Sequence, residues 1–103
     1  MQKKIIKLEN GKAIGYFINL PSAPLLLIKT QKGYVMCGYL NMTVSNKLGD
    51  IAGKVTAVTS FEDVLHAKVI EISEKAVSHG FKLGMTGKEF LNKLLELQGN
   101  GLF

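Results

Sequence analysis

The chain has 103 residues, 47% of them apolar and 20% charged, which is the size and composition of one folded domain. This composition excludes a disordered chain, and a single cysteine excludes a disulfide framework and a multi-cysteine zinc site. The longest apolar run, Leu25 to Ile28, is far shorter than the roughly 20 residues of a membrane span, and no signal-peptide core follows Lys4. We therefore expect one cytoplasmic domain over residues 1–103, with no membrane partner.

The net charge is +5, from 13 basic and 8 acidic residues, and every basic residue is lysine. Without arginine, the chain lacks the planar guanidinium group that recognises guanine edges and phosphates in a bidentate manner. It also lacks tryptophan, so it has few stacking platforms for single strands. The lysines are scattered, apart from Lys3, Lys4 and Lys7, which would protect an edge strand. We expect a solvated basic surface and no nucleic-acid partner.

The first forty residues have the pattern of strands. Residues 3–9 have the alternation of a strand, with Ile6 and Leu8 on one face and Ile5 on the other. Asn10-Gly11 is typical of a two-residue hairpin turn, and residues 12–20 form a second alternating segment. Two prolines interrupt residues 21–24. A nearly apolar third strand follows at 25–30, and a turn that ends at Gly33 leads to a fourth strand at 34–40. Two hairpins predict a mostly antiparallel sheet.

The next segment predicts one short helix and a fifth strand. Asn41 is a suitable N-cap for a helix over 42–48, which Gly49 would terminate. Residues 51–58 are rich in β-branched side chains and predict a strand. The ten positions 41–50 are marginal for a parallel crossover, which usually needs about a dozen residues or more. The fifth strand is therefore expected to lie apart from the fourth or to pair antiparallel elsewhere.

The remaining sequence predicts two longer helices on one face of the sheet. Ser60 would cap the first, which runs to about His79 and ends at Gly80. Its apolar stripe comprises Phe61, Leu65, Val69, Ile72 and Ala76, with Ile70 and Val77 on a second line. Thr86 to Glu89 form a capping box for the last helix. Residues 98–103 would form a loose or docked tail. The fold class is α+β, with a sheet of four or five strands.

Two possible functional motifs, a phosphate-binding loop and a pair of histidines, are explained by structural roles alone. The segment from Gly84 to Lys88 resembles a phosphate-binding loop, but Glu89 replaces the required hydroxyl residue, and the capping box explains its residues. His66 and His79 would lie roughly 20 Å apart along one helix, so they could not chelate one metal together. We expect no metal site and no cofactor.

Cys37 is the strongest candidate for a reactive residue in this sequence. A nucleophilic cysteine needs a neighbouring base, cation or helix N-terminus, and Lys29 or His66 could supply one only through a tertiary contact. Gly38 would let a ligand approach the backbone, Tyr39 could offer a ring and a hydroxyl group, and Asn41 begins the short helix. If the protein has a small-molecule site, we expect it at Cys37, Gly38, Tyr39, Asn41 and Asp50.

The run APLLLIKTQKGYVMCGYLN, followed by KLGD, SFEDVL and GMTGKEFL, resembles the YunC-like family of small uncharacterised bacterial and archaeal proteins. The resemblance extends from about Leu20 to Leu95, and its most specific marks are Cys-Gly-Tyr-Leu and Gly-Met-Thr-Gly-Lys. It implies an α+β domain in a prokaryotic cytoplasm. It implies no particular activity.

Two functional hypotheses follow from the residues. The first is a noncatalytic binding or oligomeric accessory protein, because the apolar surfaces are wide and no acid–base constellation is evident. The second is a small-metabolite enzyme that uses Cys37 as its reactive group, assisted by Asp50 or His66. We favour the first hypothesis, and we expect a homodimer or a higher homo-oligomer because one small domain has few elements to cover its apolar faces.

Overall fold

The computed structural model describes residues 1–98 and has one six-stranded mixed sheet with four helices. The elements, in chain order, are β1 (Gln2–Leu8), β2 (Gly11–Asn19), β3 (Pro24–Lys29), β4 (Gly33–Met36), α1 (Met42–Leu48), β5 (Ile51–Lys54), α2 (Phe61–His66), β6 (Glu71–Ile72), α3 (Glu74–Ser78) and α4 (Gly87–Leu97). The fold class is α+β, as expected. Most of the expected tail, residues 99–103, lies outside the described residues. Within residues 1–98, no helix combines the length and the apolar character needed to cross a membrane.

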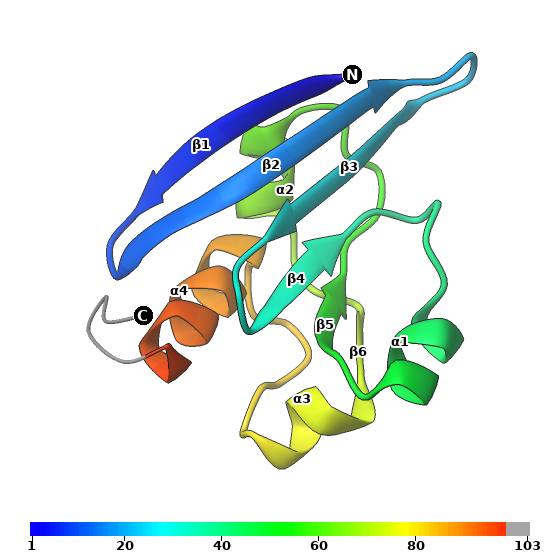
Figure 1. Cartoon of the computed structure of the whole chain (residues 1–103). Coiled ribbons are helices and arrows are strands. Elements are labelled where there is room, and N and C mark those ends of the chain that lie inside the picture. The colour runs from blue at the N-terminus through cyan, green and yellow to red at the C-terminus, as the bar shows by residue number, and fades with distance from the viewer. Residues whose placement is uncertain (99–103) are drawn as a thin grey trace.

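The strands lie side by side in chain order, from β1 at one edge to β6 at the other (Figure 1). Neighbouring strands pair antiparallel, except for β4 and β5, which are parallel. The expectation that the fifth strand avoids the fourth is therefore wrong. The fourth strand ends at Met36 rather than at Leu40, so the connection spans residues 37–50, which is long enough for a parallel crossover.

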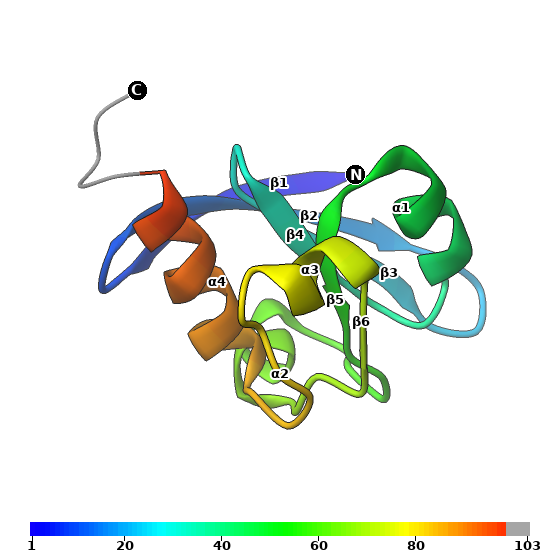
Figure 2. The same cartoon turned by 90° about the horizontal axis from the view of Figure 1, so that it is seen from below.

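The two faces of the sheet are covered differently. Helices α2, α3 and α4 lie on one face, and α1 lies on the other (Figure 2). The main core is on the three-helix side and contains the fully buried side chains Leu26, Ile28, Val35, Phe90, Leu91 and Leu94. A smaller cluster of Met36, Met42 and Ala52 lies under α1. We call the face that carries α1 the outer face.

The expectation of one long helix from Ser60 to His79 is wrong. The chain forms α2, then β6, then α3, because residues 69–72 are rich in β-branched side chains that favour extended backbone. The Ile70 N–H donates to the Lys54 carbonyl oxygen and the Ser73 N–H donates to that of Ala52, both at 2.9 Å. The Ser73 hydroxyl then caps α3 by accepting from the Ala76 N–H. Pairing with β5 replaces the helical hydrogen bonds.

The other helix boundaries are confirmed. Asn41 and Ser60 cap α1 and α2, and Gly49 ends α1 in the left-handed conformation with φ 76°. Thr86 and Glu89 form the expected capping box of α4. These signals depend on a few adjacent residues, which explains why they could be identified without tertiary information.

Candidate functional site

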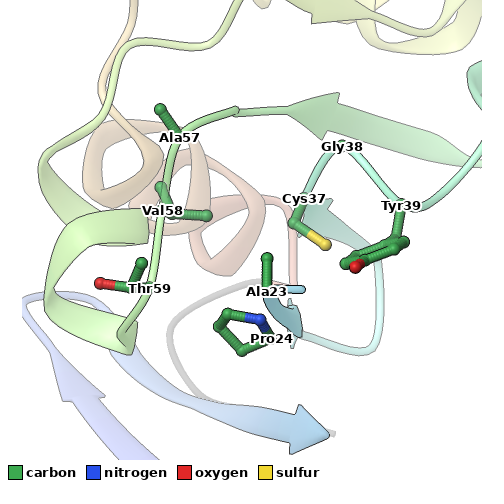
Figure 3. Close-up of a pocket in the computed structure, with 8 residues that line it drawn as sticks. All are labelled: Ala23, Pro24, Cys37, Gly38, Tyr39, Ala57, Val58 and Thr59. Carbon is green, nitrogen blue, oxygen red and sulfur yellow. The ribbon is translucent and has the colours of Figure 1, made fainter. Parts of the chain in front are cut away.

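An open cavity of about 380 Å³ lies beside the carboxyl end of β4 (Figure 3). Three segments that are distant in sequence surround it: the start of β3, the turn after β4 and the loop after β5. The lining residues are Ala23, Pro24, Cys37, Gly38, Tyr39, Ala57, Val58 and Thr59. None of them carries a formal charge at neutral pH, so the cavity favours an uncharged, largely apolar ligand.

Cys37 and Tyr39 reach this cavity from the turn after β4, not from within a strand as the sequence suggested. The Cys37 side chain is 3% exposed, and its Sγ accepts a hydrogen bond of 3.3 Å from the Leu26 N–H. Tyr39 is 49% exposed, and Figure 3 shows the Cys37 sulfur directed toward its ring. A Cβ on Gly38 would meet the Thr56 methyl group at an ordinary 3.6 Å. The space around Gly38 would therefore accommodate a small side chain.

The loop after β5 holds the opposite wall of the cavity. Ala57 has φ 59°, a left-handed conformation that is costly for alanine. Thr59 is anchored to α2, because its N–H and its hydroxyl group donate to the Asp63 carboxylate at 3.0 and 2.9 Å. The hydrogen bond from the Thr59 N–H is the main cause that lowers the pKa of Asp63 below its ordinary value. This anchoring keeps the wall in place.

A groove of about 470 Å³ lies on the outer face, between α1 and strands β3 and β4. Its lining residues are Leu27, Tyr34, Met36, Tyr39, Leu40, Asn41, Val44 and Ser45. Tyr39 also lines the cavity at Cys37, so the turn after β4 separates two concave sites. Of the expected site residues, Cys37, Gly38 and Tyr39 line the cavity, whereas Tyr39 and Asn41 line the groove.

Asp50 lies apart from Cys37. It precedes β5, whereas Cys37 follows β4, and the parallel pairing of these strands places the two residues at opposite ends. The Asp50 carboxylate accepts a hydrogen bond of 2.7 Å from the Tyr34 hydroxyl group, which is also 2.6 Å from Ser45 Oγ. Tyr34 and Ser45 were not singled out from the sequence, because they are eleven positions apart and have no motif in common.

No metal centre is evident in the described part of the chain. Residues 1–98 contain no group of three or more His, Cys, Asp or Glu side chains that could hold an ion. The Nδ1 atoms of His66 and His79 lie 2.9 Å from the carbonyl oxygens of Glu62 and Lys75, one turn earlier in each helix. Neither histidine lines the cavity at Cys37.

Comparison with known proteins gives a family but no activity. The family model described as Domain of unknown function (DUF1805) matches residues 36–94, which include the turn after β4 and the loop after β5. The chain belongs to the DUF1805 family. It is 27% identical over 95 residues to the uncharacterized protein YunC of Bacillus subtilis (strain 168). The aligned region covers 88% of this chain and 94% of YunC. This confirms the resemblance to YunC-like proteins.

A solved structure also matches this DUF1805 chain. It is the crystal structure of a protein of unknown function, TA1206, from Thermoplasma acidophilum. The TM-score is 0.85 and the identity 43%, over 90% of this chain and 91% of that chain. The bacterial match is described as uncharacterized and the archaeal match as a protein of unknown function.

Proposed function

We propose that this protein is a noncatalytic binding domain that receives a small, uncharged, largely apolar molecule in the cavity at Cys37, Gly38 and Tyr39. The observation that carries the proposal is the lining of the cavity, where three distant segments meet without a charged side chain. Concave apolar sites with few polar groups are the usual form of small-molecule sites. The lining contains no Asp, Glu, His or Lys side chain, which are the groups that most often perform acid–base catalysis.

The alternative is an enzyme in which Cys37 reacts with a small metabolite. The position of the Cys37 thiol at the cavity wall favours this alternative. Cys37 is only 3% exposed, and its Sγ accepts a hydrogen bond from the Leu26 N–H. Both observations favour a structural role for Cys37 as a small packed side chain. Alkylation of Cys37 at several pH values separates the two functions: a fast rate that titrates near neutrality supports the enzyme, and an inert thiol supports the binding domain.

The binding proposal is tested with toluene as the probe. We expect toluene to shift the backbone NMR signals of Cys37, Gly38 and Thr59 in a saturable manner. Ala23→Trp should abolish this effect, because Ala23 lines the cavity and is exposed, so the indole can fill the opening without disturbing the core.

Ser22→Trp is the matched control, because Ser22 is the exposed neighbour of Ala23 and does not line the cavity. It should keep the response to toluene. An unchanged response in Ala23→Trp, or no saturable shift in the unmodified protein, would contradict the proposal.

We also propose that the protein forms a homodimer in the cytoplasm through the outer face of β1, β2 and β3. In the strand register, Ile5 lies opposite Ile14, Tyr16 opposite Leu27 and Ile18 opposite Leu25. Ile5 is 62% exposed, so its side chain can contact a second copy. A second copy fits this surface because the apolar side chains of these strands can pack against the same side chains of the partner, and a two-fold interface uses the same surface of both copies.

A further inference from the structure

The groove between α1 and the outer face has a polar group at its buried side. Its apolar lining includes Leu27, Leu40 and Val44, whereas Ser45 is 3% exposed and contributes a hydroxyl group. Asn41, at the start of α1, already uses its amide oxygen to accept from the Thr43 N–H at 2.8 Å. Ser45 is therefore the main buried group of the groove that can form a hydrogen bond with a ligand.

The hydrogen bonds behind Ser45 determine the direction of its proton. The Tyr34 hydroxyl group has one proton, and it donates this proton to the Asp50 carboxylate, which only accepts when ionised. In the 2.6 Å contact between Ser45 and Tyr34, Ser45 must then be the donor. Its single proton is committed to Tyr34, and its oxygen keeps lone pairs that can accept.

The surroundings of Tyr34 keep its phenol protonated. Burial raises the pKa of Tyr34, and the hydrogen bond and negative charge of Asp50 act in the same direction, while the hydrogen bond from Ser45 opposes them. The phenol therefore remains a donor throughout the neutral range. At neutral pH the chain of hydrogen bonds therefore runs from Ser45 to Tyr34 to Asp50.

We propose that this groove is a second binding site, distinct from the cavity at Cys37, and that it selects a small apolar molecule carrying a hydrogen-bond donor such as a hydroxyl group. The apolar walls bury the body of the molecule, and Ser45 Oγ accepts a hydrogen bond from its hydroxyl group. A molecule that can only accept finds no free proton at Ser45. Its polar atom would have to lie at the exposed rim, near the Asn41 amide and Tyr39 hydroxyl groups, or be buried without a partner.

The test compares benzyl alcohol with benzyl methyl ether, which has a similar body but no donor. In NMR titrations, we expect benzyl alcohol to shift the signals of Leu40, Val44 and Ser45 and to bind about three- to tenfold more tightly than the ether, as one neutral hydrogen bond allows. Ser45→Ala should lower the affinity for the alcohol to that for the ether. Ser78→Ala, on α3, is the control and should keep the preference, because the Ser78 hydroxyl donates to the Lys75 carbonyl oxygen away from the groove.

Val44→Phe provides a second variant, because Val44 is 51% exposed and a larger side chain there fills the groove without disturbing the core. It should weaken the binding of both probes at this site. Equal affinities for the two probes in the unmodified protein, or a preference that survives Ser45→Ala, would overturn the proposal. So would shifts confined to Cys37 and Thr59, which would place the probes in the other cavity. Failure here leaves the toluene test at Cys37 unaffected, since the two sites give different signals.

Discussion

Tyr34 joins three elements through one hydroxyl group. It lies on β4, and its hydrogen-bond partners are Ser45 on α1 and Asp50 at the start of β5. The crossover from β4 to β5 is thus tied at its middle and at its end to the strand from which it departs. Removing the phenol oxygen would leave the Asp50 carboxylate and the Ser45 hydroxyl group without this partner.

We predict that Tyr34→Phe lowers the free energy of unfolding by about 1–3 kcal/mol at neutral pH, because a charged acceptor loses its donor. It should also change the alkaline stability. The pKa of Tyr34 is raised in the folded protein above its ordinary value of 10.0. The stabilisation that this shift supplies is therefore complete below about pH 10 and is lost as the pH rises through the folded value.

Urea unfolding from pH 7 to pH 11 measures this effect. The unmodified protein should lose stability above pH 10 more steeply than Tyr34→Phe does. Tyr16→Phe is the control, because the Tyr16 hydroxyl group forms no hydrogen bond within residues 1–98. Parallel pH profiles for the unmodified protein and Tyr34→Phe would show that Tyr34 does not contribute in this way.

At the scale of elements, the turn before α4 explains one of the two most specific marks of the family resemblance. Thr86 and Glu89 cap α4, and the Val69 N–H donates to the Met85 carbonyl oxygen at 2.7 Å. A Cβ on Gly87 would overlap the carbonyl oxygen of Val64 on α2. The residues of this turn are thus required for the close contact of α2 with α4 and need no phosphate ligand to explain them.

We predict that Gly87→Ala lowers the free energy of unfolding by about 1–3 kcal/mol, because the two helices must move apart at a packed contact. Gly38→Ala is the matched control, since its Cβ would make an ordinary contact, and it should change stability by less than about 0.5 kcal/mol. Denaturant unfolding of both variants measures the difference. Equal stability of the two variants would mean that the helix contact can relax freely.

The whole molecule has an uneven distribution of charge. Lys3, Lys7, Lys12 and Lys29 share the outer face with the apolar side chains of β1, β2 and β3, as the register and the burial of Ile6 show. On the other side of the sheet, α2 carries two acidic residues, and the lysines of α3 and α4 are accompanied by acidic residues. Two copies that meet through their outer faces would therefore bring lysines together, and apolar burial would have to exceed this repulsion.

We predict a dimer whose dissociation constant falls as salt is added, because salt screens the repulsion between the lysines. Light scattering over a dilution series at low and high salt measures this. Ile5→Lys should shift the protein toward the monomer. Leu83→Lys should not, although Leu83 is also 62% exposed, because it lies between α3 and α4 and away from the outer face. A mass of one chain at every dilution would refute the dimer.

Much of the fold could be predicted from the sequence because its signals are local. The Asn10-Gly11 turn, the caps at Asn41, Ser60 and Thr86, and the left-handed Gly49 each depend on residues that are close together in the chain. The expected grouping of Cys37, Gly38 and Tyr39 also follows from their adjacency, and all three line one cavity. Alternation in β1 correctly placed Ile6 and Ile5 on different faces.

The tertiary structure decided whatever depends on contacts between distant segments. The apolar stripe from Phe61 to Ala76 fits a helix, yet pairing of residues 70–73 with β5 divides that segment, because backbone hydrogen bonds to a neighbouring strand satisfy the same groups. Asp50 was grouped with Cys37 because the sequence does not reveal that β4 and β5 are parallel. The chain of hydrogen bonds from Ser45 through Tyr34 to Asp50 exists only because the crossover returns α1 to the outer face. Local propensity determined the hairpin turn and the helix caps of this protein. The pairing of distant strands determined the division of residues 60–79 and the positions of the concave sites.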